Sequence, residues 1–419
     1  MDKLKIWFVP NYSYLSWPLY RKLINEIKTH IKCEIIKLNY KNYLNLFNIY
    51  DKQYYEDENV SYCELILYGS KLSRNRLINK INTIKFAVAN FIRIESYIKE
   101  NSPKLIVVGS DCADINVRFL LGLSMLYQIP IIIMYNTEIA KIEKKKLSNL
   151  FNWFLRKLNI NKIFIFLAAV FYNCDIPGSF AYNSKICVVS NDVKTRLIEY
   201  GIQPERLFVL GLGIEVDEPK DMKISWDVKK ELLGKNSRKV VSFFTECISD
   251  VYGYQYSEFL YETIYREFIK LSDDIAIIIK LHPRESVKDV DFIKNTFRES
   301  RFKVISDIEA NQIISISDLV IAHYSKVLII ASLMDKSILS VNFKNEHGRT
   351  FLSNKEAQFL EINSKHEMID KINKALYDEE YKDTAKKLIK EISNRYNSSD
   401  EDVKKIIQLL LDTAGCGIR

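Results

Sequence analysis

The stretch IIIKLHPRE, residues 277–285, has a counterpart in DLVIAHYS, residues 318–325. Each begins with a short apolar run, which is typical of a buried strand, and each ends abruptly in polar side chains. In a doubly wound α/β sheet, the groups at the carboxyl ends of the strands line the crevice where ligands bind. Two strands that both end in a histidine therefore indicate a binding site, with hydrogen-bond donors suited to a phosphate.

The size and alternation of elements predict two α/β domains. The chain has 419 residues, more than one hydrophobic core usually holds. Its pattern alternates strands with helices, which favours parallel sheets covered by helices on both faces. In the first half we expect helices at 17–31 and 84–100, and strands at 4–9, 33–38, 63–68, 104–109, 131–135, 186–189 and 207–210.

A second series begins at 239–244. It continues with strands at 275–281, 302–305, 318–322 and 337–342, and with helices at 256–271, 287–298, 325–334, 366–376 and 380–413. We therefore expect a first domain at 1–214, a linker at 215–238, a second domain at 239–380 and C-terminal helices at 381–419.

The composition excludes several classes of protein. Apolar residues make up 47% and charged residues 27%, an ordinary globular balance. The net charge of +8 suits an anionic partner, but no nucleic-acid-binding signature appears, so we expect no nucleic-acid partner. The seven cysteines form no CxxC pair and indicate neither a disulfide framework nor a zinc site. The N-terminal apolar run is too short for a signal peptide, which predicts a cytoplasmic protein.

The junction VVSNDVKTRLIEYGIQPERLFVLGLG, residues 188–213, predicts a strand, a helix and a further strand. Ser190 can cap the helix, and Gly201 can end it in a left-handed conformation. This segment resembles the end of the N-terminal domain in glycosyltransferases of the GT-B fold. PKLIVVGSD, residues 103–111, with Ile129 and Pro130 opening the next strand, is similar to the acceptor domain of that family.

The second domain carries a further resemblance. KLHPRE, residues 280–285, and SDLVIAHYSKVLIIASLMDKSILSVNF, residues 317–343, resemble the donor-binding domain of bacterial surface-polysaccharide transferases. Similar patterns occur in sialyl- and polysialyltransferases, capsule Kdo transferases and teichoic-acid glycerophosphotransferases, all of which use cytidine-activated donors. The resemblance implies an α/β protein of the GT-B fold, with two Rossmann-like, doubly wound domains that face a central cleft and are followed by C-terminal helices.

The residues at the strand ends suit an activated donor. Departure of a phosphate leaves negative charge, which positioned hydrogen-bond donors stabilise. His282 can contact the donor phosphate or sugar, and Ser325 stands where a helix N-terminus can hold a phosphate. The same histidines could instead be structural, hydrogen-bonded residues at strand ends. We predict a donor site made of Thr245, Glu246, His282, Pro283, Arg284, His323, Ser325 and Lys326.

The acceptor hydroxyl requires a general base. Asp111, Asp114 and Glu138 follow predicted strands of the first domain and are the candidates, with His282 as a further catalytic residue. Asp111 is equally suited to be a helix N-cap. The acidic triplet of the sialyltransferases is absent, and the His-Tyr-Ser-Lys at 323–326 stands where glycerophosphotransferases usually have Asp-Tyr-Ser-Ser. These differences leave the donor and the base open.

The sequence contains neither a GxGxxG fingerprint nor a DxD triplet or metal-ligand spacing. We therefore expect no cofactor and no bound metal, with the nucleotide sugar as substrate. The leading hypothesis is a metal-independent glycosyltransferase that acts on a glycan or lipid-linked acceptor of surface-polysaccharide assembly. The alternatives are a CDP-glycerol-type glycerophosphotransferase, a sugar-nucleotide 2-epimerase and a catalytically silent assembly subunit.

A basic and aromatic segment, 141–172, lies within a predicted insertion at 141–175. Four lysines precede the runs LFNWFLRKL and IFIFLAAVFY, and no acidic residue occurs between Glu143 and Asp175. The apolar run is too short to span a bilayer. Such a segment suits a helix that lies on an anionic membrane surface, so we expect peripheral association with the membrane. A helix pair packed within the first domain is the alternative.

Overall fold

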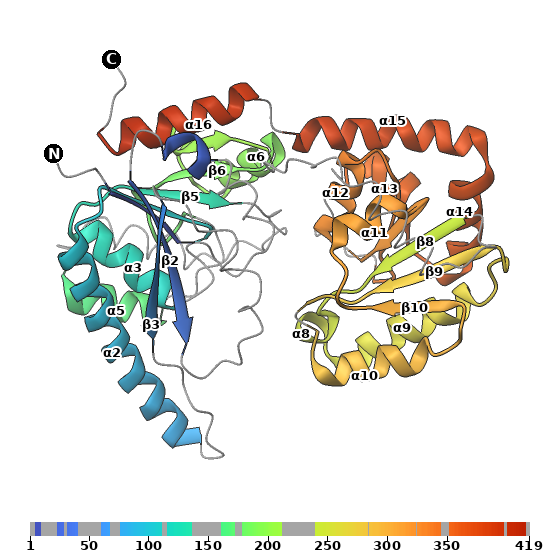
Figure 1. Cartoon of the computed structure of the whole chain (residues 1–419), viewed down its shortest axis with the longest axis horizontal. Coiled ribbons are helices and arrows are strands. Elements are labelled where there is room, and N and C mark those ends of the chain that lie inside the picture. The colour runs from blue at the N-terminus through green and yellow to red at the C-terminus, as the bar shows by residue number, and fades with distance from the viewer. Residues whose placement is uncertain are drawn as a thin grey trace. The chain divides into compact units, whose positions relative to one another are not determined.

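The computed structural model describes residues 5–9, 23–28, 32–40, 60–67, 76–110, 115–135, 161–171, 178–211, 239–283, 285–323, 325–344, 352–397 and 400–415. Contacts between Cα atoms divide the chain into two compact units (Figure 1). The first unit comprises Met1–Ile214 and Ser398–Arg419, and the second comprises Glu215–Asn397.

The first unit is built on a parallel, seven-stranded sheet of order β3-β2-β1-β4-β5-β6-β7. The six strands from β3 to β6 follow the doubly wound order, in which strands are added outward in opposite directions from β1 and β4. The strands are β1 (Lys5–Val9), β2 (Lys32–Tyr40), β3 (Val60–Leu67), β4 (Leu105–Val108), β5 (Ile131–Tyr135), β6 (Lys185–Val188) and β7 (Leu207–Val209).

Helices cover both faces of this sheet. Side chains alternate along β1, so Trp7 faces one side and packs against Tyr97 of α2 (Arg76–Asn101), at 5.1 Å between ring centroids. On that side α2 also contacts α3 (Ile115–Leu126) and α5 (Lys162–Phe171). Ile6 and Phe8 face the other side and join a core with the last helix, α16 (Asp400–Thr413). The C-terminal helix is therefore part of the first unit.

The junction before the linker folds as predicted. Ser190 is the N-cap of α6 (Asn191–Glu199), and its hydroxyl accepts a hydrogen bond of 3.2 Å from the backbone N–H of Val193. Gly201 has a φ of +91°, a left-handed conformation that glycine adopts without strain. Arg206 is buried beyond it and donates to the carbonyls of Gly178, Ala181 and Ser184, so it fixes the segment that leads into β6.

The second unit repeats the doubly wound plan. Its sheet is parallel, with the order β10-β9-β8-β11-β12-β13. The strands are β8 (Lys239–Phe244), β9 (Ile275–Lys280), β10 (Phe302–Ile305), β11 (Leu319–Ala322), β12 (Ser337–Val341) and β13 (Glu361–Ile362). The helices are α8 (Ile248–Tyr252), α9 (Tyr254–Phe268), α10 (Val287–Thr296), α11 (Ala310–Ile316), α12 (Lys326–Leu333), α13 (Asn354–Leu360), α14 (Lys365–Tyr377) and α15 (Glu379–Tyr396).

A continuous core fixes these helices on the sheet. Apolar residues of α9, α10 and α14 pack on the same side chains of β8, β9, β11 and β12, among them Phe243, Ile279 and Ile321. The central strands β8, β9, β11 and β12 are buried on both faces, as expected of a parallel sheet covered by helices. Both units thus have the predicted fold class, which is confirmed.

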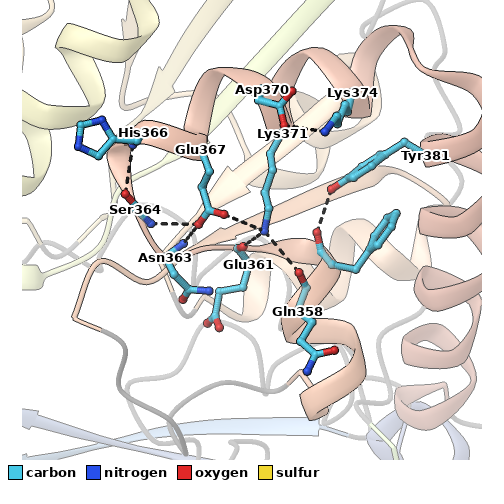
Figure 2. Close-up of polar contacts among 11 residues, drawn as sticks. Gln358, Glu361, Asn363, Ser364, His366, Glu367, Asp370, Lys371, Lys374 and Tyr381 are labelled. Atoms are coloured by element: carbon cyan, nitrogen blue, oxygen red, sulfur yellow. Dashed lines mark hydrogen bonds and ion pairs between the residues drawn. The ribbon is translucent and has the colours of Figure 1, made fainter.

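The turn from β13 into α14 is fixed by side chains (Figure 2). Ser364 and Glu367 form a capping box, in which the Ser364 hydroxyl accepts from the backbone N–H of His366 at 3.2 Å and the Glu367 carboxylate accepts from that of Ser364 at 3.0 Å. Lys371, one turn further, donates to the carbonyl oxygen of Glu361. The short strand β13 is therefore anchored to the helix that follows it.

Candidate functional site

The strand register brings three loops to one edge of the second sheet. Phe244, the last residue of β8, pairs with Lys280 of β9 on one side and with Ala322 of β11 on the other. The residues after these strands therefore lie level at the carboxyl edge. The order of the sheet also reverses between β8 and β11, the place where doubly wound sheets bind ligands.

His282 is held at this edge by two contacts with the loop after β8. Its backbone N–H donates to the hydroxyl of Thr245 at 2.9 Å, and Nδ1 of its ring lies 3.3 Å from Sγ of Cys247. Pro283 follows in a turn that is closed by the Glu285 N–H and the His282 carbonyl at 3.1 Å. The position and the ring orientation of His282 are thus set by its neighbours.

His323 occupies the other side of β8. It is buried, and its Nδ1 lies 3.7 Å from the carboxylate of Glu246. The rings of Tyr252 and Tyr256 meet its imidazole edge to face, at 5.7 and 6.3 Å between centroids. The ammonium group of Lys344 lies 4.3 and 4.4 Å from the centres of the same two tyrosine rings. Two basic groups and two aromatic rings therefore gather beside β11.

Glu285 supplies an unusual carboxyl group. Burial raises its pKa from 4.5 to about 7, and the nearby Asp289 carboxylate acts in the same direction, while hydrogen bonds from Thr245 and Tyr261 oppose the change. Near neutral pH this carboxyl is a mixture of donor and acceptor forms, which suits contact with a sugar hydroxyl or a phosphate.

Tyr261 connects Glu285 to the loop after β8. Its hydroxyl lies 3.0 Å from the carbonyl oxygen of Glu246 and 3.2 Å from the carboxyl of Glu285. The Tyr261 hydroxyl has one proton, and it can donate that proton to either of these two acceptors. Burial raises the pKa of Tyr261 well above 10, which keeps the phenol neutral. The Tyr261 hydroxyl thus links the loops after β8 and β9.

The start of α12 lies at the same edge. Ser325 is its N-cap, and the Ser325 hydroxyl accepts from the backbone N–H of Val327 at 3.4 Å. Lys326 is the first helical residue. The hydroxyl thus completes its own helix, and its predicted contact with a phosphate stays a prediction.

Not every predicted residue can be located. Thr245, Glu246, His282, Pro283, His323, Ser325 and Lys326 all follow β8, β9 or β11 at this edge. Arg284 and the three candidate bases, Asp111, Asp114 and Glu138, fall outside the described residues.

Sequence reasoning overlooked the residues that come from other segments. Cys247, Tyr252, Tyr256, Tyr261 and Lys344 belong to the loop after β8, to α8 and α9, and to the segment after β12. Only Lys344, a polar residue three positions beyond the buried strand β12, carried a signal that could have found one of them.

Comparison with protein families and with curated proteins finds no match to this sequence. Solved structures do match. A putative UDP-N-acetylglucosamine 2-epimerase from Listeria monocytogenes has a TM-score of 0.63 and 12% identity, over 98% of this chain and 97% of its own. The UDP-GlcNAc 2-epimerase from Neisseria meningitidis, bound to UDP-GlcNAc, has a TM-score of 0.62 and 14% identity, over 98% and 100%.

The glycotransferase of kitacinnamycin is also similar, with a TM-score of 0.59 and 11% identity, over 99% of this chain and all (100%) of that one. At such low identity the likeness shows the fold alone. That fold is the two-domain, GT-B-like α/β architecture common to these epimerases and to this transferase. The likeness extends over nearly the whole chain, so both units belong to it.

Proposed function

We propose that this chain is a glycosyltransferase that moves a sugar from a nucleotide-activated donor to a glycan or lipid-linked acceptor of surface-polysaccharide assembly. The observation that carries the proposal is the group formed by Thr245, Glu246, His282, Glu285 and His323 at the switch point of the second sheet. Donors, acceptors and one carboxyl of raised pKa converge there, as recognition of a phosphorylated sugar requires.

The reaction assigns a role to each part of this group. The acceptor oxygen attacks the anomeric carbon, the bond from that carbon to the donor phosphate breaks, and a general base takes the proton of the acceptor. His282, His323 and Lys344 stabilise the negative charge on the departing phosphate. Glu285 and Glu246 hold hydroxyl groups of the donor. Asp111, Asp114 or Glu138 is the base.

The second candidate is a sugar-nucleotide 2-epimerase, because the fold of two such epimerases matches nearly the whole chain. That reaction requires acid and base groups at the nucleotide-sugar site and no acceptor. Glu285, with a pKa of about 7, could exchange a proton near neutral pH.

Two measurements test the proposal. A thermal-shift screen with UDP, CMP, CDP and GDP identifies the nucleobase of the donor, because a bound nucleotide raises the melting temperature by mass action. The matching nucleotide sugars are then incubated with and without synthetic lipid-linked glycan acceptors, and the products are analysed by NMR. Sugar transfer to an acceptor supports the transferase. A 2-epimer formed without acceptor supports the second candidate and refutes the first.

Other results of these two measurements would support one of the alternative functions or refute the site assignment. Transfer of glycerol phosphate from CDP-glycerol would assign the chain to the glycerophosphotransferases. Binding of a nucleotide sugar without any product would favour the assembly subunit. If no nucleotide stabilises the protein, the site assignment is wrong. Asp111→Asn should lower the transfer rate more than donor affinity; unchanged kinetics would move the role of base to Asp114 or Glu138.

A further inference from the structure

The first unit exposes a set of large apolar side chains on two neighbouring helices. Ile84, Val88 and Ile92 lie four residues apart on α2, and Ile163 and Leu167 lie four residues apart on α5. Residues at this spacing share one face of a helix. More than half of Ile84 and Ile92, and 73% of Ile163, is accessible to solvent. These five residues are called the α2–α5 face below.

The two helices lie side by side (Figure 1). The ammonium of Lys162 lies 2.5 Å from the carboxylate of Glu95, and the ring of Phe166 meets that of Phe91 at 5.7 Å between centroids. Because the later residue of α5 meets the earlier residue of α2, the helices run antiparallel. Their exposed rows are therefore neighbours on one surface.

The charges around this surface are mainly basic. Lys85, Arg93, Lys99 and Lys162 are all exposed. Glu95, which lies along the same row of α2, is largely covered and is paired with Lys99 at 2.8 Å as well as with Lys162. Its charge is thus compensated within the face. Glu100, in the last turn of α2, is the remaining acidic group among the described residues of these two helices.

We propose that the α2–α5 face binds the surface of an anionic lipid bilayer. The apolar side chains enter the boundary between headgroups and acyl chains, and the surrounding lysines and arginine contact lipid phosphates. The helices would lie flat, since none of the helices within the described ranges is long and apolar enough to span a membrane. Such a surface would bring the enzyme to lipid-linked acceptors.

This surface differs from the segment that the sequence suggested. Of 141–172, the described part is 161–171, which includes most of α5. The apolar row of α2 was not part of that prediction, and it supplies three of the five exposed residues. The proposal therefore stands on α2 and α5 together, and does not depend on 141–160.

A second copy of the chain fits this face less well. A twofold interface places the same patch on both partners. The mainly basic surround of one copy, with Lys85, Arg93 and Lys162, would then face the same basic surround of the other, and like charges in contact are unfavourable. Anionic lipid provides the opposite charge. The charge distribution therefore favours the membrane as the partner.

The test is sedimentation of the full chain with vesicles of phosphatidylcholine alone or with about 30% of the anionic lipid phosphatidylglycerol. The wild type should sediment with the anionic vesicles, and less so as salt is raised. Ile163→Asp and Val88→Asp should each weaken binding at least about tenfold, because each replaces an inserted apolar side chain by a charge.

The matched control is Val287→Asp. Val287 is 79% exposed and is the first residue of α10 in the second unit, much as Ile163 is the second residue of α5. Aspartate is tolerated near the start of a helix, so both variants should fold, which circular dichroism checks. Val287→Asp should bind vesicles as the wild type does.

Three results would overturn the proposal. The first is absence of wild-type binding to anionic vesicles. The second is equal binding by the wild type, Ile163→Asp and Val88→Asp. The third is a wild-type dimer, measured by light scattering, that Ile163→Asp converts to a monomer, because the face would then be a contact between copies. None of these results depends on nucleotide-sugar activity, so the proposed function is tested separately.

Discussion

The sulfur of Cys247 lies 3.3 Å from Nδ1 of His282. This contact joins the loop after β8 to the loop after β9, beside the hydrogen bond from the His282 backbone to Thr245. It orients the imidazole. It also places a thiol at the edge of the candidate site. The rate at which this thiol is chemically modified can therefore show whether a ligand is bound there.

Iodoacetamide should therefore label Cys247 before the buried cysteines. Burial raises the pKa of Cys33 and Cys187 to about 12, so at pH 8 their thiolate fraction is roughly one in ten thousand. Cys247 is only partly buried. Mass spectrometry of tryptic peptides should show at least about tenfold faster labelling of Cys247 than of these two. A stabilising nucleotide should slow it. If the labelling rate of Cys247 is the same with and without the nucleotide, the nucleotide binds elsewhere.

Replacing His282 should remove activity without unfolding the protein. His282→Ala removes a hydrogen-bond donor next to the predicted position of the phosphate. We expect kcat to fall by about 100-fold or more. The control is His366→Ala, since His366 is exposed at the start of α14. Donor turnover and the melting temperature are measured for both variants. A fully active His282→Ala protein would contradict the assignment.

Glu285 should make the free energy of unfolding depend on pH. Its pKa is about 7 in the folded protein and 4.5 as the ordinary value, so between these pH values the folded state holds one more proton than the unfolded state. Stability therefore falls as pH rises through this window. Glu285→Gln should stabilise the protein by about 1–2 kcal/mol at pH 8, and by much less at pH 5, after allowance for the remaining exposure of Glu285.

Urea unfolding at pH 5, 6, 7 and 8 measures this effect. Glu262→Gln is the control, because Glu262 is exposed on α9. It should leave the pH profile unchanged. An equal effect of Glu285→Gln at pH 5 and pH 8 would show that the carboxyl is ionised throughout, and that burial does not raise its pKa.

Arg206 should be required for the stability of the first unit. Its guanidinium is buried and donates to three carbonyl oxygens and to the Ser184 hydroxyl. Lysine cannot reproduce this forked geometry, so Arg206→Lys should cost about 2–4 kcal/mol of unfolding free energy. Arg266→Lys, at an exposed position of α9, should cost less than about 0.5 kcal/mol. Similar losses for the two variants in urea unfolding would refute the anchoring role.

The strands of the second sheet could be predicted because parallel strands are buried on both faces and so appear as continuous apolar runs. The runs at 239–244, 275–281 and 318–322 match β8, β9 and β11 to within one residue at either end. β13 escaped prediction because it has two residues, too few for any period. α3 was not assigned because nine of its twelve residues are buried, which erases the amphipathic pattern.

The candidate site was predictable only where a strand leads directly into it. His282 and His323 stand immediately after apolar runs, and topology brings both to one edge. Tyr252 and Tyr256 pack against His323, and Lys344 lies over both tyrosine rings. These residues come from distant parts of the chain, so no local spacing relates them. The raised pKa of Glu285 could not be anticipated either, because it arises from burial.

The packing of α16 has a consequence for how this protein comes into being. Val403, Ile406, Leu410 and Leu411 fill the same core as Ile6 and Phe8 of the first strand. A ribosome that has finished Ile214 has therefore delivered an incomplete core, which must wait for almost two hundred further residues. The nascent N-terminal half would expose that apolar surface meanwhile, and it would offer chaperones a binding site until α16 has been made.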